Sequence, residues 1–142
     1  MRIRRVSSLV VLFLCLAVFG ESQQKQIKHV PVKLTSPTSG QEMYTAYCAA
    51  CHGRDGKGNG PAAEALKVPP PDLTTLARKN GNRYPSDHVR SAITGDVRLP
   101  AHGSKEMPVW GELFWRMSQG HSTEVQLRVR NLNKHIESMQ TN

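Results

Sequence analysis

The chain has 142 residues, and its 19 Lys and Arg outnumber its 11 Asp and Glu, which gives a formal net charge of +8. This length predicts one small domain, in which a large apolar cofactor would form much of the core. No stretch pairs clustered Lys and Arg with aromatic side chains, so the charge does not indicate a nucleic-acid partner. It suits instead an acidic protein partner or an anionic membrane surface.

Residues 1–22 have the three parts of a secretory signal peptide. A positively charged start precedes an apolar run over 9–19, and the small residues Gly20 and Ser22 precede a cleavage site near Gln23. The apolar run is short for a membrane span. We therefore predict export to the periplasm, with an uncleaved N-terminal membrane anchor as the alternative.

Residues 23–39 form a polar and basic stretch that contains two prolines and lacks helical or strand periodicity. This composition predicts an extended arm, which either lies over the domain or tethers it. The domain is predicted over 40–142. Its first helix begins after Ser39, which can form a capping box with Glu42, and this helix leads into Cys48.

A C-x-x-C-H motif follows at Cys48, Cys51 and His52. This pattern is the attachment site of a c-type haem, in which the two thiols form thioethers and the histidine binds the iron. Cysteines three residues apart project from the same side of a helical turn, where the two vinyl groups of one porphyrin lie. The third cysteine, Cys15, lies in the predicted leader, and we assign it no chemistry.

The cysteine pair has two other possible roles. A structural zinc site needs four ligands, and the chain has no second cysteine pair to supply them. A thioredoxin-type redox pair belongs at the end of a strand, whereas the region before Cys48 has a helical pattern. The haem motif remains the best interpretation.

Glycines recur between residues 53 and 60, and a run of three prolines follows at 69–71. The glycines allow tight turns and a close approach to a planar ligand. A rigid proline segment beside a haem can present a backbone carbonyl to Nδ1 of the axial histidine. We assign this role to Pro70 or Pro71; the alternative is that the prolines only stiffen a loop.

Short helices are predicted at 62–66 and 72–77, and a longer one is capped by Ser86 and ends at Gly95. A final long helix carries an apolar stripe that consists of Val125, Val129, Leu132, Ile136 and Met139. Basic residues on its other face, including Arg128, are expected to be solvated.

Met107 is our candidate for the second axial ligand. It lies on a proline- and glycine-flanked loop well after the motif, and a thioether ligand suits electron transfer. Trp110 is expected to pack on the haem edge or to donate to a propionate. Other possible ligands are the core-like Met117 and Met139 and, for ligation by two histidines, His88, His102 and His121.

The residues resemble the bacterial mono-haem class I c-type cytochromes over about 40–136. The motifs that carry this resemblance lie at 44–53, 58–62, 71–73, 93–95 and 107–111. The resemblance implies an all-α fold of short helices wrapped around one covalently attached haem, with the first and last helices crossing near one haem edge. It also implies thioether bonds to Cys48 and Cys51, and axial ligation by His52 and Met107.

The function predicted from these features is one-electron transfer between exported or membrane-bound redox proteins, without substrate turnover. Basic residues around an exposed haem edge would dock an acidic donor or acceptor. One alternative is a ligand-binding or peroxidase-like haem protein with an open sixth coordination site. Another is an electron-transfer subunit that the arm holds in a larger membrane or dehydrogenase complex.

Overall fold

The computed structural model describes residues 32–96 and 109–141, and these are helical, with no strand within the two ranges. The elements in chain order are α2 (Gly40–Met43), the π-helical stretch η1 (Tyr44–Cys48), α3 (Ala49–His52), the 3-10 turns η2 (Ala63–Ala65) and η3 (Leu73–Thr75), α4 (Leu76–Lys79), α5 (Ser86–Thr94), α6 (Trp110–Met117) and α7 (Ser122–Ser138). The predicted all-α fold is confirmed. Within the described ranges, no helix is both long and apolar enough to span a membrane.

Ser39 caps the first helical segment as predicted, since its hydroxyl accepts a hydrogen bond of 3.1 Å from the Glu42 amide. The second half of the predicted capping box differs. The Glu42 carboxylate accepts from the amide of Ser36, at 3.1 Å, and so fixes the chain three residues before the cap. Ser39 therefore caps the helix through its hydroxyl, while the Glu42 side chain bonds to the segment before the helix instead of to the cap residue.

The helix that leads into the cysteine motif changes from α2 to the π-helical η1 before it continues as α3. A π-helical turn holds an extra residue, is rare, and is found mostly at functional sites. The sequence predicts a helix here and gives no sign of this change. Within η1, Tyr44 is 1% exposed, and its hydroxyl donates a 2.8 Å hydrogen bond to the Gly53 carbonyl, directly after the motif.

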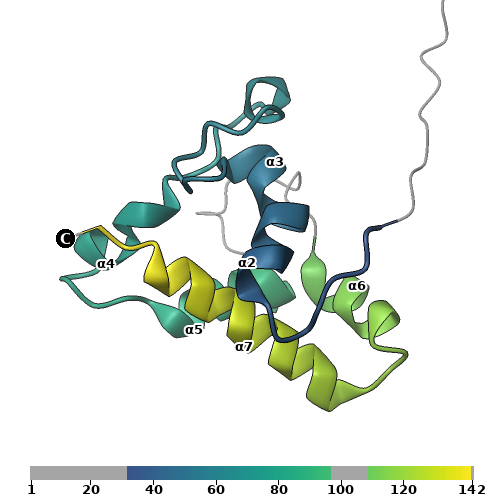
Figure 1. The fold of residues 1–142 in the computed structure, drawn as a ribbon. Helices are drawn as coiled ribbons and strands as arrows, with labels where there is room; N and C mark the ends of the chain where they lie inside the picture. Colours follow the sequence, from purple (N-terminus) through teal and green to yellow (C-terminus); the bar gives the residue numbers. More distant parts are fainter. Residues whose placement is uncertain (1–31, 97–108, 142) are drawn as a thin grey trace, which may run out of the picture. The chain divides into compact units, whose positions relative to one another are not determined.

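Helices α2 and α7 cross closely at Gly40 (Figure 1). A Cβ atom at this position would lie 2.1 Å from the carbonyl oxygen of Asn131 and 2.8 Å from Cβ of His135. Both neighbours belong to α7, and the nearer one is backbone. Only glycine allows the two helices to approach this closely.

One face of α7 forms the centre of the core, as its apolar stripe predicts. Val129, Leu132 and Ile136 are buried and share the core with Met43 and Phe114. Val125 and Met139 at the ends of the stripe are half-buried against the same core. The 3.6-residue periodicity thus predicts the buried face of α7 correctly.

Arg128 is not solvated, contrary to the prediction from the sequence. It is 4% exposed, and its guanidinium donates to the Glu124 carboxylate at 2.8 Å and to the Thr35 carbonyl at 2.9 Å. The charge is buried because residues 32–38 lie over this part of α7. Glu124 compensates the charge, which makes the burial tolerable.

Two further hydrogen bonds attach the described end of the predicted arm to the domain. The Tyr47 hydroxyl donates to the Lys33 carbonyl at 2.6 Å, and the Asn131 side-chain amide donates to the Pro37 carbonyl at 2.9 Å. Residues 32–38 therefore follow the domain surface. The domain limits proposed from the sequence remain predictions.

The start of α5 also differs from expectation. Ser86 is the first residue of the helix and not its cap, and its hydroxyl accepts from the buried Asn133 amide of α7 at 2.9 Å. Pro85 occupies the cap position without a capping side chain. The end of α5 is as predicted, because Gly95 adopts the left-handed conformation with φ 78°.

Replacing Gly40 by alanine is expected to lower the free energy of unfolding by about 2 kcal/mol, because the new methyl group would force α2 away from α7. Denaturant unfolding measures this loss. The exposed neighbour Gln41, changed to alanine, is the control and should unfold close to wild type. Equal stabilities for the two variants would contradict the close crossing.

His135 is expected to make stability depend on pH. Its ring lies 5.2 Å from the buried Tyr44 ring, and burial lowers its pKa in the folded state. The pKa of His135 is lower in the folded protein than its value of about 6.5 in the unfolded chain. Its contribution to stability is therefore present above the unfolded pKa and is lost as the pH falls through the folded pKa. In His135→Gln, unfolding free energies measured between about pH 7 and pH 5 should fall less steeply than in wild type. Identical slopes would exclude the effect.

Candidate haem site

The C-x-x-C-H motif is presented by the short helix α3 and the residue before it. Cys48 is 9% exposed, Cys51 is half-buried, and His52 is 8% exposed. Both thiols are free, with no disulfide between them. Because α3 is a single helical turn, the two thiols and the imidazole lie within five consecutive residues of one short helical segment.

Burial raises the pKa of the Cys48 thiol to about 12, with a smaller contribution from the neighbouring Cys51. Cys48 is therefore a neutral thiol near pH 7. A redox-active pair depends on a thiol with a lowered pKa, so the environment of Cys48 opposes a thioredoxin-like role. Among the described residues, no group of three or more His, Cys, Asp or Glu side chains is arranged to hold a metal ion.

The glycine-rich loop folds back over the end of α3. The amides of Gly58 and Gly60 donate to the carbonyls of His52 and Cys51, at 2.8 and 3.0 Å. These carbonyls are among those that a helix end leaves without partners. The loop therefore fixes the backbone of two motif residues by direct hydrogen bonds.

The proline segment lies against both this loop and His52. The Pro71 carbonyl oxygen is 3.4 Å from Nδ1 of His52, so of the two prolines nominated from the sequence, Pro71 makes this contact. The Pro70 carbonyl faces Gly58, where a Cβ atom would lie only 2.3 Å from it. In the tautomer that carries its proton on Nδ1, His52 donates to Pro71, and its unprotonated Nε2 is the nitrogen that can bind iron.

Hydrogen bonds also fix the backbone that follows Pro71. The Asp72 carboxylate accepts from the Thr74 amide at 2.8 Å and from the Thr74 hydroxyl at 2.6 Å. These bonds lower the pKa of Asp72. The Leu73 amide donates to the Gly56 carbonyl at 2.7 Å, which joins the proline segment to the glycine loop a second time.

A largely apolar cavity opens beside the motif. Cys48 and His52 lie in its wall, together with side chains from α4, α5, α6 and α7 that include Leu76, Ile93 and Ile136. These residues fit a haem, because they combine an apolar enclosure with a thiol and an imidazole at its edge. The fit supports the site predicted from the sequence.

Trp110, the first residue of α6, also lines this cavity. Its ring stacks on that of Tyr47, with 5.0 Å between the centroids and 29° between the planes. Tyr47 comes directly before Cys48, so the pair connects α6 to the start of the motif. Whether the indole packs on a haem or donates to a propionate stays a prediction.

Of the candidates for the second axial ligand, some lie within the described residues and some do not. Met107 and His102 lie outside the described residues. His88 on α5 lines the same cavity as His52, whereas Nδ1 of His121 lies 2.7 Å from the Ser118 carbonyl, at the turn before α7. His88 is thus the described histidine that competes best with Met107. The other two methionines, Met117 and Met139, pack against the core as predicted.

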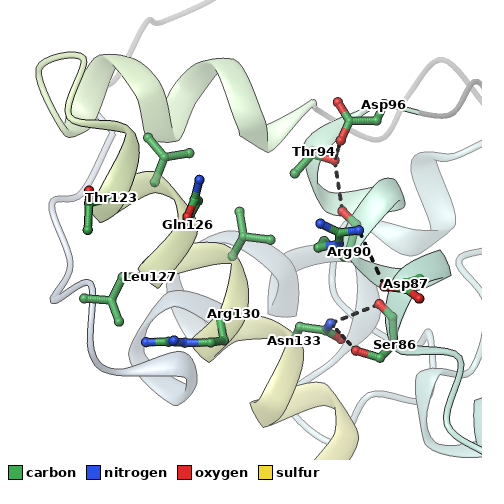
Figure 2. Close-up of a pocket in the computed structure, with 12 residues that line it drawn as sticks. Ser86, Asp87, Arg90, Thr94, Asp96, Thr123, Gln126, Leu127, Arg130 and Asn133 are labelled. Carbon is green, nitrogen blue, oxygen red and sulfur yellow. Dashed lines mark hydrogen bonds and ion pairs between the residues drawn. The ribbon is translucent and has the colours of Figure 1, made fainter.

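A second hollow lies between α5 and α7 (Figure 2). Charged side chains of both signs line it, namely Arg90, which lies 3.5 Å from Asp87, together with Asp96 and Arg130. Its lining also includes the apolar Val125, Leu127 and Val129, and none of the described motif residues lines it. It therefore differs from the apolar cavity beside His52.

A protein-family model described as cytochrome c oxidase, cbb3-type, subunit III matches residues 35–115, which is more than half of the chain. The chain belongs to this family. Comparisons with curated proteins and with solved structures gave no match. Membership identifies a cytochrome c domain with a c-type haem and a role in electron transfer.

The family match covers the motif, the glycine loop, the proline segment and α5, but it ends within α6. The matched family pattern of this cytochrome c domain therefore includes the residues around the motif but not the residues of α7 that pack near it. The Tyr44 hydroxyl and the Asp72 cap were not singled out from the sequence, whereas His88 was named there as one of three possible histidine ligands. The sequence does indicate the Asp72 cap, because an aspartate directly before a helical turn is a typical N-cap residue.

Gly58→Ala is expected to destabilise the cytochrome c domain more than Gly81→Ala. Both glycines have positive φ, at 79° and 64°, so alanine strains the backbone at both sites. Only Gly58 would also drive its Cβ into the Pro70 carbonyl, because nothing lies within 4 Å of a Cβ at Gly81. Denaturant unfolding of the two variants isolates this steric cost, expected at about 1–3 kcal/mol. Equal losses would show that the loop does not press on the proline segment.

Proposed function

We propose that this cytochrome c domain is a mono-haem class I one-electron carrier, with thioether bonds at Cys48 and Cys51 and axial ligation by His52 and Met107. The observation that carries the proposal is the contact between His52 Nδ1 and Pro71, beside a cavity that Cys48 also lines. When bound, the haem supplies an iron that alternates between ferrous and ferric states. The chain holds the imidazole, encloses the site with apolar side chains and keeps water from it.

The proposed Met107 ligand rests on chemistry and on position in the chain. A thioether raises the reduction potential and, by filling the sixth coordination position, favours electron transfer over ligand binding. Trp110, three residues later, lines the cavity, so Met107 is close along the chain to the site. His88 in the cavity wall is the competing ligand.

The proposed setting is the periplasm, reached through the predicted signal peptide at 1–22, with a membrane-anchored form as the alternative. The partners are proposed to be redox proteins with acidic docking faces, since the chain carries a net positive charge. A second candidate function is that of an electron-transfer subunit in a membrane oxidase complex. The description of the matched family favours this candidate.

The ferric absorption spectrum of the exported, haem-loaded protein tests the ligand assignment. Methionine sulfur bound to ferric haem produces a weak far-red charge-transfer band, which we expect in wild type. Met107→Ala should lose this band, bind carbon monoxide in the reduced state and lower the potential by on the order of tenths of a volt. The control is Met117→Ala, which changes a methionine packed against the core and should keep the band.

The outcome that would overturn the assignment is a Met107→Ala protein with an unchanged spectrum and potential. If His88→Ala then opened the iron to carbon monoxide, the domain would have two histidine ligands. Carbon monoxide binding by the reduced wild-type protein would instead favour the ligand-binding or peroxidase-like alternative with an open sixth site.

A further inference from the structure

The C-terminal end of the described chain is bonded to the turn that follows the prolines. The side chain of Gln140 donates to the Leu73 carbonyl at 2.7 Å and accepts from the Ala77 amide at 2.9 Å. Its Nε2 also donates to the Ile136 carbonyl of α7 at 2.9 Å. One uncharged side chain thus joins the end of α7 to η3 and to the first turn of α4.

The next residue adds a backbone bond to the same turn. The Thr141 amide donates to the Thr74 carbonyl at 2.9 Å, and the Thr141 hydroxyl is 3.2 Å from the same oxygen. The residues of this turn lie more than 60 positions before Gln140 and Thr141 in the sequence. These contacts therefore fix a distant loop against α7.

Few rotatable bonds separate this turn from Pro71. The ring of Pro71 fixes its φ angle, and Asp72 is tied to Thr74 through its carboxylate. Leu73 is held on both sides, since its carbonyl accepts from Gln140 and its amide donates to Gly56. A displacement of Leu73 would consequently move the Pro71 carbonyl as well.

The contact that Pro71 makes is sensitive to such a displacement. Its oxygen lies 3.4 Å from His52 Nδ1, beyond the usual N–H···O range of about 2.7–3.2 Å. At this distance a further shift of a few tenths of an ångström removes most of the interaction. The position of Leu73 thus affects the distance between the Pro71 carbonyl and His52 Nδ1.

We propose that Gln140 is a positioning residue for His52, acting through Leu73 and the Pro71 carbonyl. The inference rests on the proposed function, in which His52 is an axial ligand. Donation from Nδ1 to a carbonyl raises the basicity of a ligating imidazole and fixes its orientation. A more basic ligand stabilises the ferric state, so Gln140 lowers the reduction potential of the loaded protein.

Gln140→Met tests the proposal in the haem-loaded, full-length protein. Methionine has a similar volume and no charge, so it removes the three hydrogen bonds without an electrostatic change. The matched control is Ser138→Ala, which removes an exposed hydroxyl that donates to the His135 carbonyl at the same helix end. The measurements are the midpoint potential and the NMR chemical shift of the His52 Nδ1 proton.

We expect Gln140→Met to raise the midpoint potential and to move the Nδ1 proton upfield, as a weaker hydrogen bond requires. Ser138→Ala should leave both values at those of wild type. A Gln140→Met protein with reduced stability but unchanged potential and proton shift would overturn the proposal, because a structural role alone produces that result. If wild type carries no haem bound by His52, the proposed function fails first, and the two failures are thereby distinguished.

A second variant tests the proposal if the Gln140→Met protein does not fold. Thr141→Pro removes the backbone donor to Thr74 together with the hydroxyl that lies near the same oxygen, and it keeps the Gln140 side chain. The same two shifts are expected at smaller size. Their absence in a folded Thr141→Pro protein, together with an unfolded Gln140→Met protein, would also count against the proposal.

Discussion

The contact between the Pro71 carbonyl and Nδ1 of His52 is the interaction on which the rest of the site depends. Three parts of the chain converge to make it possible: the glycine loop bonds to the backbone of His52, the proline segment supplies the acceptor, and the end of α7 secures the turn behind it. The glycine loop is held by backbone hydrogen bonds, whereas the end of the chain secures the turn through the Gln140 side chain. The backbone carbonyl of Pro71 therefore helps to orient the imidazole.

Helix α7 links this site to the opposite end of the described chain. Gly40 lets α2 cross α7 closely, and Arg128 of the same helix binds the carbonyl of Thr35 in the segment before α2. Just after the end of α7, Gln140 reaches the turn after the prolines. Helix α7 and the residues just after it thus contact α2, the segment before α2 and the turn that follows the prolines. The family match ends before α7 begins.

The sequence predicts those features that depend on local pattern. The C-x-x-C-H motif, the Ser39 cap, the Gly95 stop and the buried stripe of α7 all follow from residue type and spacing. Features that depend on contacts between distant segments were missed or wrong. The burial of Arg128 requires residues 32–38 to cover it, and no periodicity within α7 reveals a partner some 90 positions earlier.

The central claim is that both cysteines of the motif hold one haem covalently. Intact-mass spectrometry of the denatured protein, produced in cells able to attach haem, tests this most directly. One haem should stay with the denatured chain, and replacing both Cys48 and Cys51 by alanine should release it. A wild-type chain that loses its haem on denaturation, or that carries none, would show that the two cysteines do not attach a haem.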